Sequence, residues 1–180
     1  MISMEKIRNI PLDKACASVK TEELFLKYEE LMTVPDPKER EKQAACIIQQ
    51  LKEYYRAKGW NVYSHDSGMR LLLHKPADLY TTEVWADAEY GLIHLKIQIP
   101  IIVEGESRFD FMARALHNFN QDSESGVGSF SLDDGNGRID YIYRYSFEDG
   151  CFTEERFRNI QKNCMKAARL YYSAILNLAK

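Results

Sequence analysis

The sequence predicts an α+β fold in which helices flank an antiparallel β-sheet, and three observations lead to this prediction. Segments with the helical spacing of apolar residues lie before, between and after groups of consecutive strand-like segments. Consecutive strands of this kind are typical of α+β folds, in which strands and helices do not alternate along the chain. Segment 93–101 alternates isoleucine or leucine with other, mostly polar residues, which is typical of a half-buried antiparallel strand. The turn-forming run 133–137 joins two further strand-like segments as a hairpin.

The predicted helices have recognisable starts and ends. Thr21, followed by two glutamates, suits the N-cap of a short helix that ends before a Pro-Asp-Pro run. Pro37 suits the first position of the next helix, and Gly59 suits the residue after its end. Thr153 caps the last helix, and Phe152 before it is placed to pack against the first turn. The predicted helices span 24–32, 37–58, 109–119 and 153–178.

The strands are predicted from period-two spacing and from β-branched and aromatic residues bounded by turn residues. They span 60–64, 69–74, 79–88, 93–101, 127–132 and 138–148. Together with the helices, they give the order α-α-β-β-β-β-α-β-β-α along the chain. The prolines at 35–37 mark the one plausible boundary, so we expect an N-terminal helical arm at 1–36 and a single α+β domain at 37–180.

The net charge of −3 is distributed unevenly along the chain. Residues 76–152 carry 5 basic and 14 acidic side chains, whereas residues 153–180 carry 6 basic and 2 acidic ones. A nucleic-acid-binding surface would require a strongly basic domain, so nucleic acid is not expected as a partner. Self-association or a protein partner fits this pattern better, although acidic loops that merely keep a sheet in solution remain the simpler explanation.

Location and redox state follow from what the sequence lacks. No apolar run approaches the roughly 20 residues needed to span a bilayer, and residues 1–20 lack the apolar core of a signal peptide. We therefore expect a cytoplasmic protein that does not bind membranes. The four cysteines, Cys16, Cys46, Cys151 and Cys164, form no C-x-x-C pair, so reduced thiols are expected. Cys46 and Cys164 fall within helical patterns, where free cysteine behaves as a small buried hydrophobe.

No motif points to catalysis or to a bound cofactor or metal. The run 133–137 is superficially similar to a calcium loop, but Leu132 and Tyr143 occupy positions where calcium needs oxygen ligands from side chains. The His-Asp-Ser run at 65–67 has the residue types of a triad, but adjacent residues point apart. The glycines at 126–128 precede a strand and not a helix, so they form no phosphate loop. We expect no enzymatic activity, no catalytic residues, no cofactor and no metal.

Tyrosines at alternate positions share one face of strand 138–148 and could form a surface that recognises a peptide. The alternative, which we favour, is that they pack beneath the covering helices, because Ile139 and Phe147 extend the same face. In the last helix, Tyr171 is expected to face inward and its neighbour to face solvent or a partner. The candidate partner-binding residues are Tyr141, Tyr143, Tyr145 and Tyr172.

A second interpretation is a small-molecule sensor or minor enzyme with a pocket between the sheet and helix 109–119. Its candidate polar groups are His94, His117, Glu104 and Glu106. His94 falls on the polar side of its alternating strand, which favours a solvated side chain over a metal ligand. A closed apolar pocket with converging polar atoms would support this interpretation.

Residues 93–178 also carry a diffuse pattern that is similar to a known family. An alternating strand leads into a helix that ends near Asn118 or Asn120, and a Thr-Glu-Glu start at 153 opens a long helix. Between them lie Gly-Ser-Phe-Ser-Leu-Asp at 128–133 and Gly-Arg-Ile-Asp-Tyr at 137–141. This pattern resembles the YbjN-like domain of the type III secretion chaperone-like superfamily.

The resemblance implies a type III secretion chaperone-like α+β fold that is often dimeric and has no enzymatic activity. Members are thought to act by protein binding, in chaperone-like or stress-related roles, and no catalytic residues carry over. The arm at 1–36 has no counterpart in the shared domain. We therefore expect a non-enzymatic protein-binding or chaperone-like domain that forms a homodimer and binds an unidentified protein or peptide.

Overall fold

The computed structural model describes residues 36–65, 68–122, 124, 126–147 and 152–180. Residues Pro37–Lys180 form one compact unit. The helix predicted at 24–32, the rest of the predicted arm up to residue 35, and Cys16 and Cys151 lie outside the described residues.

The described residues form three helices and six strands. From residue 37 onward their order is the predicted one, α-β-β-β-β-α-β-β-α, so the α+β prediction is confirmed for this part of the chain. The elements are α4 (Pro37–Ala57), β1 (Asn61–Ser64), β2 (Arg70–His74), β3 (Thr81–Asp87), β4 (Leu92–Ile102), α5 (Glu106–Gln121), β5 (Ser129–Leu132), β6 (Arg138–Ser146) and α6 (Glu154–Ala179).

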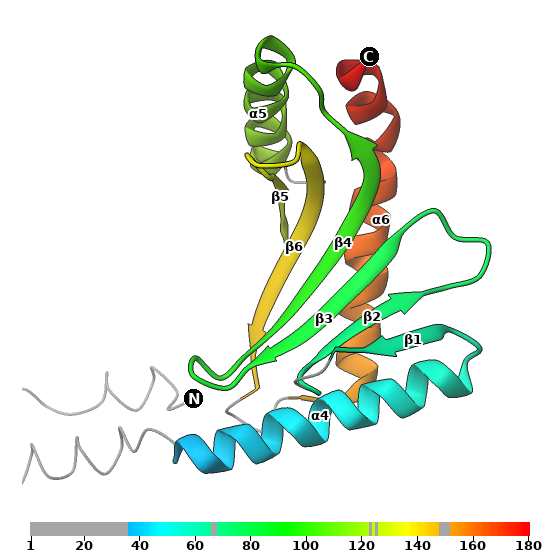
Figure 1. The fold of residues 1–180 in the computed structure, drawn as a ribbon, viewed down its shortest axis with the longest axis vertical. Coiled ribbons are helices and arrows are strands. Elements are labelled where there is room, and N and C mark those ends of the chain that lie inside the picture. The colour runs from blue at the N-terminus through cyan, green and yellow to red at the C-terminus, as the bar shows by residue number, and fades with distance from the viewer. Residues whose placement is uncertain (1–35, 66–67, 123, 125, 148–151) are drawn as a thin grey trace, which may run out of the picture. The chain divides into compact units, whose positions relative to one another are not determined.

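All six strands form a single antiparallel sheet with the order β1-β2-β3-β4-β6-β5. In Figure 1, α6 passes behind the strands and α4 lies across the end of the sheet near β1. Ile93 of β4 lies opposite Tyr145 of β6, and Ile97 opposite Tyr141. Because side chains directly opposite each other share a face, the β4 isoleucines and the β6 tyrosines lie on the same side of the sheet.

The core lies between this face of the sheet and the helices. The alternation predicted for β4 is confirmed on this face, where Ile93, Leu95 and Ile97 are fully buried. Each helix contributes one apolar stripe at helical spacing, and removal of this area from water is the main stabilising term. The helical core residues are Ala44, Ile47, Ile48, Leu51 and Tyr55 of α4, Met112 and Leu116 of α5, and Phe157, Cys164, Ala167, Ala168, Tyr171 and Ile175 of α6.

The helix ends follow the predicted signals in two cases. Thr153 Oγ1 accepts a hydrogen bond from the N–H of Arg156 at 3.1 Å, and the ring of Phe152 lies 6.2 Å from that of Phe157. Gly59 follows α4 with φ 76°, the left-handed conformation that glycine adopts readily. Helix α5 starts at Glu106, earlier than predicted, and its preceding Gly105 provides no side-chain cap.

The segment 133–137 forms the predicted hairpin turn. Asp133 Oδ1 accepts hydrogen bonds from the N–H groups of Gly135 and Asn136, so its carboxylate closes the turn. Within the described ranges no group of three or more His, Cys, Asp or Glu side chains is arranged to hold a metal ion.

The two described cysteines have different environments, although both are free. Cys164 is buried as predicted, and burial raises the pKa of its thiol to about 12. The prediction of burial was wrong for Cys46, which is exposed. The reason is its helical position, since the buried stripe of α4 passes through Ala44 and Ile47 and leaves residue 46 on the outer side. None of the described helices is long and apolar enough to cross a membrane.

Candidate functional site

The candidate tyrosines lie partly in the core. Tyr141 is fully buried and Tyr145 is 8% exposed, both on the helix-covered face of β6. Tyr143 is half-buried, and its ring stacks on that of Tyr145 with 6.2 Å between centroids. Tyr172 of α6 is half-buried, with its ring 6.1 Å from that of Tyr80. Tyr143 and Tyr172 therefore keep accessible surface, and the partner-binding role of the set stays a prediction.

The two buried tyrosines differ in how their hydroxyls are used. Tyr141 OH accepts a hydrogen bond from the N–H of Gly128 at 2.8 Å, and burial raises its pKa to about 12. Tyr145 OH is buried without a hydrogen-bond partner among the described residues, and burial raises its pKa well above the ordinary range. One hydroxyl therefore ties β6 to the start of β5, whereas the other stays unpaired in the core.

Replacing each tyrosine with phenylalanine should separate these cases. We expect Tyr141→Phe to lower the free energy of unfolding by about 1 kcal/mol, because the half-buried N–H of Gly128 loses its acceptor. Tyr145→Phe should leave the free energy of unfolding unchanged or raise it, because an unpaired hydroxyl no longer has to be buried. Urea unfolding followed by circular dichroism measures both, and equal losses in the two variants would contradict this assignment.

The residues of the alternative sensor site do not converge. Glu104, Glu106 and His117 are exposed at or near α5. His94 lies on the other face of the sheet, since its neighbours in β4 are the buried isoleucine and leucine of the helix-covered face. The expectation that His94 is solvated was wrong: it is 8% exposed. Neighbouring side chains cover it, since its ring stacks on that of Trp85 at 4.6 Å.

Burial makes His94 a poor proton acceptor. Burial lowers its pKa below the ordinary value of 6.5, and Arg144 lowers it further. Asp87, whose Oδ2 lies 3.8 Å from His94 Nε2, opposes this shift. Neither ring nitrogen of His94 has a hydrogen-bond partner in the described part of the chain. The neutral imidazole is therefore the form that the folded state favours.

The free energy of unfolding should depend on pH through this histidine. Above pH 6.5 both states hold His94 neutral, so its contribution is complete. As the pH falls below 6.5, the unfolded chain takes up the proton first, and stability drops by up to about 1.4 kcal/mol per pH unit. The drop ends once the pH is below the folded pKa. Between pH 7 and 5.5, we expect His94→Phe to lose this pH dependence of the free energy of unfolding. The exposed control His117→Asn should keep it. Urea unfolding at several pH values measures both variants.

An ion cluster occupies the same face of the sheet as His94. Lys96 Nζ lies 2.7 Å from Glu83 Oε2 and 3.8 Å from Asp140 Oδ2, and Arg70 Nη1 lies 3.3 Å from Glu83 Oε1. Burial raises the pKa of Asp140, and Lys96 opposes that shift. Each carboxylate here has a cationic neighbour, so the cluster is compensated and resembles a structural network more than an acid–base site.

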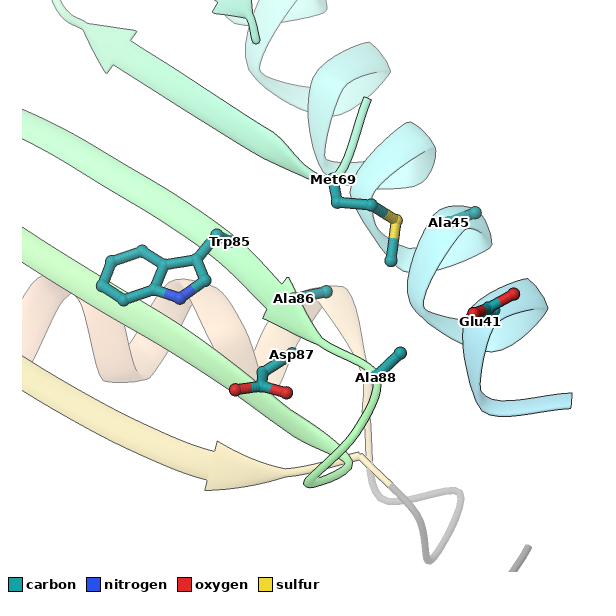
Figure 2. A pocket seen from close by; sticks show the side chains of 7 residues that line it. All are labelled: Glu41, Ala45, Met69, Trp85, Ala86, Asp87 and Ala88. Atoms are coloured by element: carbon teal, nitrogen blue, oxygen red, sulfur yellow. The ribbon is translucent and has the colours of Figure 1, made fainter. Parts of the chain in front are cut away.

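A hollow of about 600 Å³ opens between α4 and the end of β3. Figure 2 shows Met69 between the strands and the helix, with Glu41 on α4 and Asp87 on β3 at the rim. The rest of the lining consists of Ala45, Trp85, Ala86 and Ala88. The hollow lies beside α4 and not beside the 109–119 helix. Its two acidic residues lie on different elements, and Asp87 already accepts a hydrogen bond from the N–H of Tyr90 at 3.2 Å.

The two edges of the sheet differ in their hydrogen bonding. At the β5 edge, the side-chain amide of Asn120 donates to the carbonyl of Phe130 at 3.0 Å and accepts from its N–H at 2.6 Å. This amide occupies the position that a neighbouring strand would take. At Phe130 the edge is therefore already capped by α5, and this capping hinders pairing with another chain.

The β1 edge is uncapped in the part of the chain that the structure describes. The N–H of His65 donates to the carbonyl of Arg70 on the β2 side. Every second residue before His65 in β1 therefore bonds to β2. By that alternation, the backbone N–H and C=O groups of Val62 and Ser64 point away from β2. No described backbone or side-chain group bonds to them. They form a short row of donors and acceptors that an added strand could use.

Two apolar side chains lie beside this edge, on the face without helices. Tyr63 is 59% exposed, and its cross-strand partner Leu72 is 38% exposed. The spacing at 60–64 predicts the strand but singles out neither Tyr63 nor Leu72. The order of strands in a sheet is not encoded in local spacing, so the one available signal was the short length of this strand, which is common at sheet edges.

Comparisons with known proteins address the fold alone. No family model matches the sequence, and no curated protein matches it. Among solved structures, the fold is similar to that of a chain in the ExsC-ExsE complex, with a TM-score of 0.45 and 16% identity, covering 73% of this chain and 95% of that one. It is also similar to a chain of the heterodimeric ExoU-SpcU complex from the type III secretion system of Pseudomonas aeruginosa, with a TM-score of 0.48 and 16% identity, covering 72% of this chain and 97% of that one.

Proposed function

We propose that this chain is a non-enzymatic, chaperone-like protein-binding domain that takes up an extended segment of a partner protein at the β1 edge. The observation that supports it is the asymmetry of the sheet edges: Asn120 caps β5 at Phe130, whereas the outward groups of Val62 and Ser64 have no described partner. An extended segment that adds to a sheet edge gains its affinity from main-chain hydrogen bonds.

Specificity would come from the side chains next to the edge. Residues of an added strand alternate between the two faces of the sheet. Every second residue of the segment would lie on the face without helices. The residue of this set nearest to Tyr63 would contact its exposed ring, which offers apolar area with a polar tip. The edge is four residues long, so it favours a short segment.

A proline at Val62 tests the proposal. Its outward N–H is not used by the β1–β2 ladder, so Val62→Pro should remove one donor for an added strand while the sheet stays folded. The probes are 12-residue peptides selected on the wild-type chain from a random display library. We expect their affinity to fall at least about tenfold for Val62→Pro, the equivalent of about 1.4 kcal/mol, and to be unchanged for the control Val62→Thr, which keeps the N–H.

Thermal unfolding of each variant shows whether it is folded. Hydrogen exchange supplies a second readout that does not require the proline: the amides of Val62 and Ser64 should become protected when peptide binds to the wild-type chain. Peptides that bind folded Val62→Pro as tightly as wild type, or that leave both amides unprotected, would show that the segment binds elsewhere.

We further propose a homodimer, which agrees with the charge asymmetry of the sequence. A dimer has about twice the 21.0 kDa mass of the chain in sedimentation equilibrium, and a monomer at high concentration would contradict it. The YbjN-like assignment, a stress-related role and a cytoplasmic location stay predictions from the sequence.

A further inference from the structure

A basic groove of about 500 Å³ runs along α6 where the helix passes the ends of β1 and β2. One wall is α6, and the other is formed by Trp60, Lys75 and Asp78, which precede β1 or follow β2. Five cationic side chains line the groove, against one carboxylate. The cations are Lys75, Arg158, Lys162, Lys166 and Arg169.

The one carboxylate of the groove is already occupied. Asp78 Oδ2 lies 2.8 Å from Arg169 Nη2, and the same guanidinium lies over the ring of Tyr80 at 5.8 Å from its centroid. The other four cations form no ion pair with any described residue. The groove therefore holds uncompensated positive charge, which attracts an anionic group.

The cations of α6 are spaced to face one side of the helix. Arg158, Lys162, Lys166 and Arg169 follow each other at intervals of four, four and three residues. At 1.5 Å per residue this row is about 16 Å long. An extended peptide advances about 3.3 Å per residue, so about five of its residues would span the row.

A buried amide adds a polar group to the floor of the groove. Gln161 is 6% exposed and lines the groove, and its Oε1 accepts a hydrogen bond from Tyr55 OH. Burial raises the pKa of Tyr55 above its ordinary range, so this hydroxyl remains protonated and can donate. Gln161 Nε2 then has no acceptor among the residues described. This amide nitrogen is enclosed by the protein, so the recognition of a carboxylate would come from the four unpaired cations that line the groove.

We propose that this groove binds an acidic peptide segment of a partner protein. A nucleic acid suits the molecule less well, because residues 76–152 carry a net charge of −9 and would repel a longer polyanion. The inference deepens the proposed function by naming the chemistry of the partner. Since Trp60 directly precedes β1, an acidic stretch here would lie close to a segment added at the β1 edge.

The test uses a fluorescein-labelled ten-residue peptide with glutamate at every second position. Its control is the same peptide with each glutamate replaced by glutamine. We expect saturable binding of the glutamate peptide to the full chain by fluorescence anisotropy, weakening with salt, and no binding of the glutamine peptide. In Trp85→Phe, Trp60 is the one remaining tryptophan, so its emission should change as the glutamate peptide binds.

Charge reversal locates the site. The double variant Lys162→Glu with Lys166→Glu should bind the glutamate peptide at least about tenfold more weakly. The matched control is Lys52→Glu with Arg56→Glu, which reverses two cations at the same spacing on α4, outside the groove, and should bind within about twofold of wild type. Equal binding by the α6 double variant and the wild-type chain would overturn the proposal.

Other occupants give different results. Tighter binding of a single-stranded oligonucleotide with the same number of charges would overturn the proposal in favour of nucleic acid. A change from dimer to monomer in the α6 double variant would show that a second copy of the chain fills the groove. Val62→Pro should bind the glutamate peptide normally, so failure of the groove and failure of the β1 edge are distinguishable.

Discussion

Replacing Gly137 with alanine is expected to lower the free energy of unfolding by about 3 kcal/mol or more. Gly137 has φ 66°, and a Cβ there would lie 2.1 Å from the carbonyl oxygen of Val103. That contact is with backbone, which cannot move aside as a flexible side chain would. The N–H of Val103 also donates to the Gly137 carbonyl at 2.9 Å, so relief of the clash would break this hydrogen bond.

Gly59→Ala is the matched control for this variant. Gly59 has φ 76°, but a Cβ there would meet nothing within 4 Å. Its replacement should cost about 1–2 kcal/mol, which is the backbone strain of a left-handed alanine alone. Urea unfolding of both variants measures the difference. Equal losses would mean that the close approach of the hairpin to the end of β4 adds nothing to the cost.

Phe157→Ala is expected to lower the free energy of unfolding by about 3–5 kcal/mol. Phe157 is 1% exposed, and its ring lies within 6.4 Å of the rings of Tyr55, Tyr145 and Phe152. Truncation would leave a cavity between α4, α6 and β6 that rigid aromatic neighbours cannot fill. The control Phe111→Ala, at a residue of α5 that is 57% exposed, should change stability by less than about 0.5 kcal/mol.

The Phe157 variant should also weaken both proposed binding surfaces. Tyr55 touches Phe157 on one side and Trp60 on the other, with ring centroids 6.4 and 5.0 Å apart. Trp60 lines the basic groove and precedes β1, so this chain of rings positions the groove wall and the sheet edge together. In folded Phe157→Ala, we expect weaker binding of the glutamate peptide and faster hydrogen exchange of the β1 amides. An unchanged affinity for the glutamate peptide would show that other contacts position the groove.

Local signals in the sequence were sufficient for the elements that depend on neighbours in the chain. The period of 3.6 in α6, its Thr153 cap and the Phe152 contact with Phe157 are set within a few residues, as is the turn closed by Asp133. The alternation of β4 is also local, and it identified which isoleucines enter the core. These features were predictable because the side-chain spacing of an element directly determines which of its faces is apolar.

Features that depend on residues distant in the chain required the tertiary structure. The polar side of β4 was correctly recognised, but Trp85 on the neighbouring strand decides that His94 is buried there and not solvated. The exposure of Cys46, by contrast, follows from local spacing, since the buried stripe of α4 passes through Ala44 and Ile47 and leaves residue 46 outside it. The capping of β5 by Asn120 is a contact between a helix and a strand, and no local pattern predicts it.

The sequence by itself therefore determined the α+β class from residue 37 onward and the excess of basic charge in the last helix. Only the tertiary structure decided that β1 is the uncapped edge, and that Lys75 joins the α6 cations in one groove. The physical reason is that periodicity and capping are local, whereas strand order and groove walls arise from long-range packing of surfaces whose partners are far apart in the chain.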